Sequence, residues 1–178
     1  GVTGEIQHNR FADLFREWAG DRDYEAVIAG GRDAWRLAGE LAEKEVPVLF
    51  ERVYNMTSNM AATPARDIDP YDIHFRAPSI LHAAGVKLLL GEGLGGDGAA
   101  NVRNLPYTAA QAIAFGLPEE AAHRAITLHP AEIYGVAGQL GSIEEGKEAT
   151  FFASTGDVFD IRSRVTHLWI RGGPVPLE

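Results

Sequence analysis

The stretch AVIAGGRDAWRLAGELAEKEVPVLF, residues 26–50, places two short apolar runs on either side of one amphipathic segment. The runs at 26–29 and 46–50 are typical of buried strands, and residues 32–44 carry apolar side chains at helical spacing. A strand–helix–strand unit of this length has to cross over, which predicts that its two strands pair in parallel. A third apolar run at 86–90 has the same character. We therefore expect an α/β fold built on a parallel sheet.

Further helices are expected before the first strand and on either side of the third. Apolar spacing predicts them at 10–19, 72–84, 107–115, 119–127 and 130–134. The segments 51–70 and 91–101 show no such period and are expected to be loops, the second of them rich in glycine.

The character of the chain changes after Gly138. Residues 151–153 and 165–170 are strand-like, and turns are expected at 145–146, 155–157 and 172–174. We therefore expect two parts, an α/β body over residues 1–138 and a small β module over residues 139–178.

Composition excludes several classes of function. The 178 residues carry a net charge of −9, which disfavours binding to nucleic acids and to anionic membranes. No apolar stretch is long enough to cross a bilayer, and cysteine is absent, which removes thiolate chemistry. The chain opens without methionine and without a targeting pattern, so we expect a piece of a longer or processed protein, in a compartment that the sequence does not indicate.

The glycine-rich loop raises the hypothesis of a dinucleotide site. Residues 91–96 fit the pattern G-x-G-x-x-G after an expected strand. Such a site needs a helix to begin within the loop, so that its amides face the pyrophosphate. The loop is expected to continue through Asp97, which disfavours this hypothesis.

The polar residues of this loop are the first candidates for chemistry. Glu92 and Asp97 could bind a metal ion or act as a general base, or could be solvated loop acids. Arg103 and Asn104 could bind a substrate carboxylate or phosphate, or could hold the loop by hydrogen bonds. The six histidines form neither H-x-H nor H-E-x-x-H, so their spacing predicts no metal site.

Three stretches carry a family resemblance. QLGSIEEGKEATFFAST at 139–155 resembles the signature G-S-[IL]-x-x-G-K-x-A-D-[LF], with Thr150 in place of its aspartate. AAGVKLLLGEG at 83–93 and AITLHPA at 125–131 resemble two further motifs, the second of which has asparagine in place of His129. Together these stretches resemble the imidazolonepropionase-like members of the amidohydrolase superfamily.

This resemblance implies a fold. The three expected strands would be late strands of a partial TIM-type (β/α)₈ barrel, and residues 139–178 would be the C-terminal share of a small β-sandwich. A partial barrel leaves sheet edges open, so we expect a homo-oligomer or a missing N-terminal part of the same protein.

The resemblance also implies a chemistry. Members of the superfamily are metal-dependent hydrolases that use zinc, manganese or iron on small molecules with amide or cyclic amide C–N bonds. Their metal ligands include an H-x-H on the first strand and strand-end histidines, which are missing here, so we expect no metal ligand in this chain. The family aspartate of the eighth strand aligns with Glu92 or Gly93.

Two hypotheses follow from the resemblance. In the first, the chain is the C-terminal part of a hydrolase and is inactive alone. Its active face is then formed by Glu92, Asp97, Asn101, Arg103 and Asn104. In the second, it is a non-catalytic binding or structural module that has lost its metal ligands.

Overall fold

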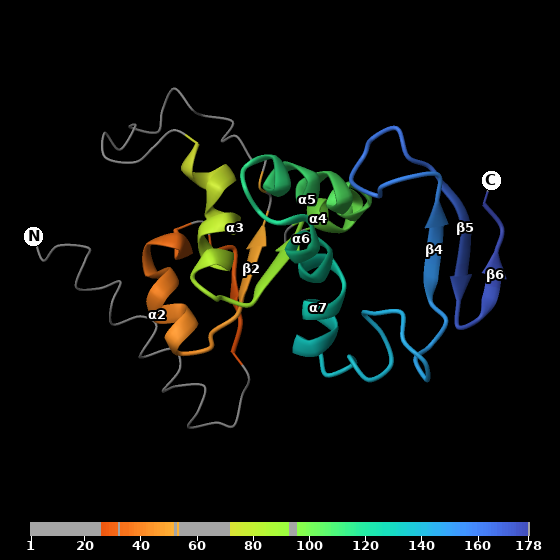
Figure 1. Ribbon diagram of the computed structural model, residues 1–178, viewed down its shortest axis with the longest axis horizontal. Helices are drawn as coiled ribbons and strands as arrows, with labels where there is room; N and C mark the ends of the chain where they lie inside the picture. Colours follow the sequence, from red (N-terminus) through yellow and green to blue (C-terminus); the bar gives the residue numbers. More distant parts are fainter. Residues whose placement is uncertain (1–25, 32, 52, 54–71, 93–95, 178) are drawn as a thin grey trace, which may run out of the picture.

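The computed structural model describes residues 26–31, 33–51, 53, 72–92 and 96–177. Within these residues the chain forms two three-stranded sheets, which lie apart in Figure 1. The helix expected at 10–19 and nearly all of the loop expected at 51–70 lie outside the described residues.

The first sheet is parallel. It consists of β1 (Ile28–Ala29), β2 (Val48–Glu51) and β3 (Leu88–Gly91), in that order. Ile28 is opposite Val48, and Glu51 is opposite Gly91. The prediction of neighbouring parallel strands is confirmed, and the carboxyl ends of the three strands therefore lie at one edge of the sheet.

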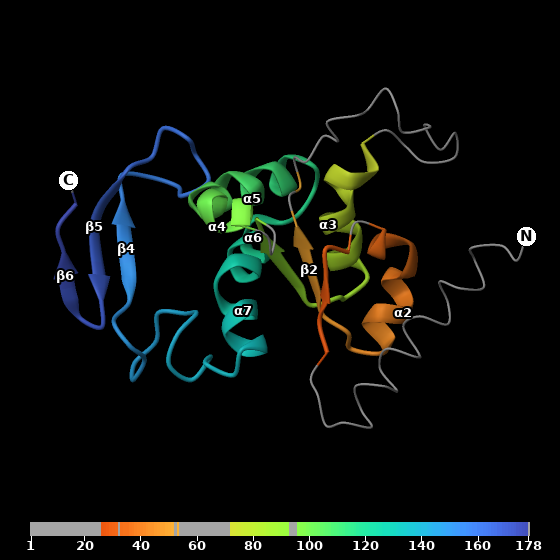
Figure 2. The same ribbon diagram turned by 180° about the vertical axis from the view of Figure 1, so that it is seen from behind.

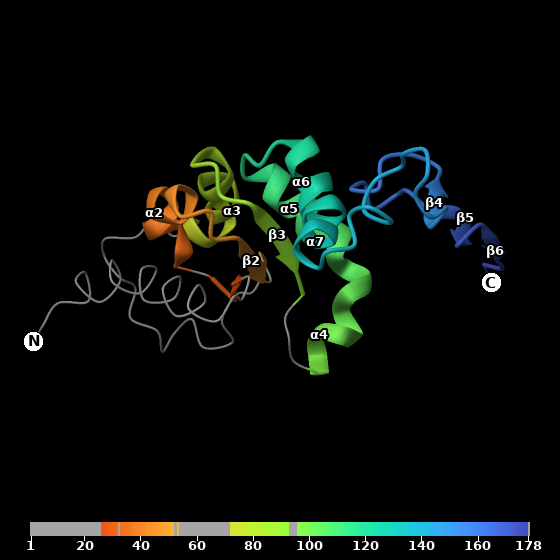
Figure 3. The same cartoon turned by 90° about the horizontal axis from the view of Figure 1, so that it is seen from below.

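Helices follow each strand of this sheet. They are η1 (Ala34–Leu37), α2 (Ala38–Glu43), α3 (Ile73–Ala83), α4 (Gly96–Asn101), η2 (Val102–Asn104), α5 (Leu105–Ala114), α6 (Glu119–Ile126) and α7 (Leu128–Ile133). In Figure 3, α2, α3, α5 and α6 lie along the same side of the sheet. The helix expected at 32–44 is present as η1 followed by α2, a 3₁₀ turn that continues into an α-helix.

The main core fills the space between the sheet and these helices. Val48 and Phe50 of β2, with Leu88 and Leu90 of β3, are buried against helical residues. Those helical residues are Leu41, Leu81, Ala109, Ala112, Ala122 and Ala125. Because alanine is small, α5 and α6 can approach the sheet closely.

The prediction of a continuous loop at 91–101 is wrong in its second half, because α4 occupies residues 96–101. Two glycines and an aspartate within six residues give the segment a low helix propensity. Gly98 is nevertheless buried, and α4 leads directly through η2 into α5. Packing therefore overrides the local preference.

The second sheet is antiparallel. It contains β4 (Phe151–Ser154), β5 (Val165–Ile170) and β6 (Gly173–Val175), and it lies at the C-terminal end of the molecule (Figure 2). Of the turn expected at 172–174, Gly172 does lie in a turn, whereas residues 173–174 begin β6. Ile170 pairs with Gly173 across Arg171 and Gly172, whose φ angles are 51° and 78°. Positive φ at both central residues is the geometry of a tight two-residue hairpin.

One aromatic side chain joins the two parts. Phe159, in the connection from β4 to β5, is 8% exposed and belongs to the core under the parallel sheet. Phe151, Phe152 and Ile170 of the second sheet are exposed. In the described part of the chain, no helix has the length and apolarity that crossing a membrane requires.

Candidate functional site

A half-buried carboxylate, one of whose oxygens is fully buried, lies at the carboxyl edge of the parallel sheet. Glu51 ends β2, and its Oε1 is buried without a hydrogen-bond partner among the described residues. Gly30, just beyond β1, lies beside it, since a Cβ there would be 3.7 Å from Glu51 Oε2, in ordinary van der Waals contact. Buried polar atoms in native proteins almost always have a partner, so this oxygen is a candidate contact for a water molecule or a ligand. Parallel sheets with helices place their sites at this edge.

Glu92 lies at the same edge, directly after β3. It is 5% exposed, and its Oε1 accepts a hydrogen bond from the hydroxyl of Thr108, a fully buried residue of α5. A buried carboxylate is costly unless polar groups compensate it. The contact with α5 therefore fixes the position of the Glu92 side chain.

The other predicted residues follow on the segment that connects β3 with α5. Asp97 lies in α4, although its side chain is outside the described part, and Asn101 is the last residue of α4. Arg103 is exposed on η2, and Asn104 is half-buried immediately before α5. The structure thus places all five predicted residues on one segment after β3, and it brings Glu51 to the neighbouring strand end. The residue pattern alone does not single out Glu51, because its position depends on the register with Gly91.

The described residues at this edge do not form the metal centre that the family resemblance implies. The described residues at or just beyond the three strand ends are Gly30, Glu51 and Glu92, and none of the three is a histidine. Two carboxylates on adjacent strand ends provide fewer protein ligands than the three that catalytic zinc sites use.

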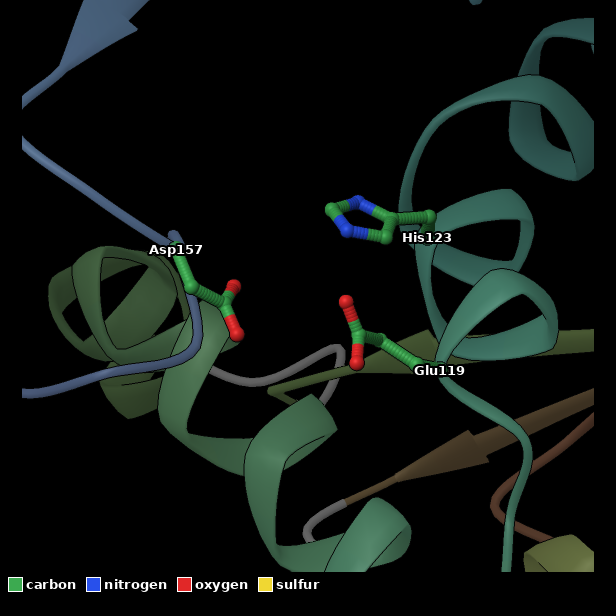
Figure 4. A group of neighbouring side chains, drawn as sticks. All are labelled: Glu119, His123 and Asp157. Carbon is green, nitrogen blue, oxygen red and sulfur yellow. The ribbon is translucent and has the colours of Figure 1, made fainter.

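A three-ligand group does occur elsewhere among the described residues. Glu119 and His123 of α6 and Asp157 of the β4–β5 connection are all exposed, and their potential ligand atoms lie within 4.8 Å of one another. Figure 4 shows the two carboxylates and the imidazole ring directed toward a common space. Sequence spacing misses this group because Asp157 is far from α6 in the chain. The i, i+4 pair Glu119–His123 is the one signal that was available.

Comparison with known proteins gives a consistent result. The sequence profile described as the amidohydrolase family matches residues 50–175. An amidohydrolase from Thermotoga maritima superposes with a TM-score of 0.73 and 26% identity, over 90% of this chain and 39% of that chain. A prolidase in complex with N-methylphosphonate-L-proline superposes with a TM-score of 0.62 and 23% identity, over 86% and 40%. No match is found among curated proteins.

These similarities have a defined extent. The chain spans about two fifths of the length of the solved structures that it matches, at 39% and 40%. The match to the family profile extends over more than half of the 178 residues, from β2 to β6. The family is generally metal-dependent, and its solved members have the mixed α/β architecture seen here. The chain belongs to the amidohydrolase family.

Proposed function

We propose that this chain is the C-terminal part of a metal-dependent hydrolase that cleaves C–N bonds in amides or cyclic amides. The observation that carries the proposal is the buried Oε1 of Glu51 at the carboxyl edge of a parallel sheet, which has no hydrogen-bond partner among the residues that the structure describes. The prolidase neighbour supports the reaction class, since its ligand carries a phosphonate on the nitrogen of L-proline. A tetrahedral phosphorus there resembles the transition state of attack on an amide carbon.

The architecture proposed for the whole protein follows from the two sheets. Strands β1 to β3 are late strands of a TIM-type barrel, and β4 to β6 are the C-terminal share of a β-sandwich. The first part corresponds to residues 1–138 and the second to residues 139–178. The remaining strands belong to an N-terminal part of the same protein or to a second copy.

Each residue of the proposed site has a role that its chemistry allows. A carboxylate at the strand ends, from Glu51, Glu92 or Asp97, accepts the proton of the attacking water and returns it to the leaving nitrogen. Glu51 is the best placed of the three in geometry, because no described group occupies its buried oxygen. Arg103, with its planar pair of donors, binds a carboxylate of the substrate, and Asn101 and Asn104 hydrogen-bond its polar atoms.

The metal ligands of the whole enzyme come, on this proposal, from outside the described residues. The isolated 178-residue chain should then be inactive. The test incubates the intact protein with N-acyl amino acids, dipeptides that end in proline, and cyclic amides, and it measures bound zinc, manganese and iron. Hydrolysis of one substrate class by the metal-loaded intact protein, with none by the isolated chain, supports the proposal. An intact protein that holds stoichiometric metal and cleaves none of these substrates contradicts it.

A non-catalytic module is the second candidate. The strand ends Gly30, Glu51 and Glu92 include no histidine, and that observation favours it. On this alternative the intact protein binds no catalytic metal, and the exchange of Glu51 for glutamine changes none of its rates. Hydrolysis rates of the intact protein and of its Glu51→Gln variant therefore separate the two candidates.

A further inference from the structure

Three side chains with metal-binding chemistry meet where α6 faces the connection between β4 and β5. They are Glu119, His123 and Asp157, with potential ligand atoms within 4.8 Å of one another (Figure 4). We propose that they bind a zinc ion, which joins the connection before β5 to α6. This site is separate from the strand ends at which the proposed hydrolysis takes place.

Helix α6 presents two of the ligands together. Glu119 is its first residue and His123 follows four positions later, so the two side chains lie on one face of the helix. The His123 ring packs against the Phe159 ring, with centroids 4.4 Å apart. Because Phe159 is buried in the core, this contact holds the imidazole in place.

The third ligand is also held in place. Asp157 Oδ1 accepts a hydrogen bond of 2.9 Å from the backbone N–H of Phe159, and the Asp157 carbonyl accepts one of 3.1 Å from Asp160 N–H. Phe159 therefore orients both ligands, because its ring packs against His123 and its backbone N–H donates to Asp157. Two of the three ligands are thus oriented by one anchor, which lowers the ordering cost of binding an ion.

The charges of the group favour a cation. Within the described residues, Lys or Arg pairs with four other acidic side chains, Glu132, Glu144, Glu148 and Asp160. No such ion pair joins Glu119 or Asp157 to a described basic residue. Two carboxylates this close repel each other, and a divalent cation between them would replace that repulsion with attraction.

The donor set indicates which cation. Calcium and magnesium take oxygen ligands, whereas one imidazole nitrogen with two carboxylate oxygens suits zinc. Zinc bonds of about 2.0–2.1 Å in a tetrahedron place ligand atoms roughly 3.4 Å apart. Rotation of the three exposed side chains can bring their ligand atoms from within 4.8 Å of one another to this shorter separation. Three protein ligands leave the fourth position for water.

The test measures zinc binding to the intact protein after treatment with a chelator. His123→Phe retains a ring against Phe159 but removes the ligand nitrogen, and Asp157→Asn retains the acceptor for Phe159 N–H but removes the charge. Each variant should bind one zinc ion fewer than the wild type, or bind it at least roughly 10-fold more weakly, since even outer-shell changes cost that much. Zinc should also raise the melting temperature of the wild type more than that of either variant.

Glu120→Gln is the matched control, because Glu120 carries the same charge in the same turn of α6 and is not in the group. It should bind zinc as the wild type does. Circular dichroism checks that each variant is folded, and Glu119→Gln provides a third test of the site. Equal zinc stoichiometry and affinity in the wild type, His123→Phe and Asp157→Asn would overturn the proposal. The readout is the difference in zinc binding between the wild type and the variants, so zinc bound at a hydrolytic centre contributes equally to each and cancels. A failure of either proposal therefore does not decide the other.

Discussion

The Nδ1 atom of His129 lies 2.7 Å from the carbonyl oxygen of Leu88. The carbonyl of Lys87, the preceding residue, accepts a hydrogen bond of 3.0 Å from the backbone N–H of Val48 in β2. Successive carbonyls along a strand point in opposite directions. The Leu88 carbonyl therefore points away from β2, toward the side of β3 on which no described strand lies. The imidazole of α7 thus supplies a donor that a further strand would otherwise provide.

The exchange His129→Ala should destabilise the protein. It leaves a half-buried carbonyl without this donor, which we expect to cost about 1 kcal/mol in the free energy of unfolding measured in urea. His129→Asn should restore part of the loss, because an amide N–H can make the same bond. His82→Ala, a change of a half-buried histidine on α3, is the control. An equal loss in the two alanine variants would contradict the role given to this hydrogen bond.

Thr108→Val should destabilise the protein by about 1–3 kcal/mol, because it removes the hydroxyl that donates to the buried Glu92 carboxylate at nearly constant volume. The control is Thr166→Val, which removes an exposed hydroxyl bonded to the Ala153 carbonyl at 3.2 Å and should have a much smaller effect. A double-mutant cycle with Glu92→Gln isolates the pair, and a coupling energy near zero would be inconsistent with the contact.

Two glycines of the segment between α7 and β4 allow the energetic cost of a steric clash to be measured separately from that of backbone strain. Gly141 and Gly146 have φ angles of 92° and 90°, but only at Gly141 would a Cβ meet other atoms, 2.6 Å from Ala131 Cβ. Gly146→Ala should cost about 1–2 kcal/mol of left-handed strain, and Gly141→Ala roughly 3–5 kcal/mol because overpacking is added. Urea denaturation measures both values, and equal costs would contradict the packing described for Gly141.

The carboxyl group of Asp160 should titrate at unusually low pH. Hydrogen bonds from the Arg162 side chain, and from its backbone N–H, lower the Asp160 pKa from 3.8 to about 2. A folded-state pKa below the unfolded value means that the contribution to stability is present above about pH 4 and is lost as the pH falls toward 2. Salt should reduce the shift, since both side chains reach solvent.

Arg162→Gln should return the Asp160 pKa toward 3.8, which the chemical shift of the carboxyl carbon reports in an NMR titration. Glu144, whose pKa is lowered mainly by the Ser142 hydroxyl and also by Lys147, should titrate identically in this variant and the wild type. A titration of wild-type Asp160 at 3.8 would refute the assignment.

The sequence predicted the parallel sheet because its cause is local. Short apolar runs and an amphipathic helix are visible in residues 26–50, and crossover sterics then determine the direction of pairing. Segment α4 was missed because burial of Gly98 outweighs its poor helix propensity. Strand β6 was missed because Gly173 and Pro174 are typical of a turn, whereas the hairpin at Arg171 and Gly172 pairs them with β5.

The candidate sites were only partly predictable for a related reason. Glu92 and the polar residues after it follow a strand directly, so their position could be inferred from order alone. The importance of Glu51 depends on its register with Gly91 and on its position beside Gly30, which are properties of the folded sheet. The group that includes Asp157 forms because Phe159 enters the core next to His123, a contact between distant parts of the chain.

The function proposed above makes the carboxyl edge of β1 to β3 one side of a hydrolytic centre, and that assignment can be tested. Its most direct test is kcat/KM for amide hydrolysis by the intact protein and its Glu51→Gln variant, with Glu120→Gln as the control for the loss of one surface charge. We expect a loss of roughly 100-fold or more for Glu51→Gln, which is typical for removal of a group that transfers protons, and no change for the control. A Glu51→Gln protein that is folded and hydrolyses the amide at the wild-type rate would contradict it.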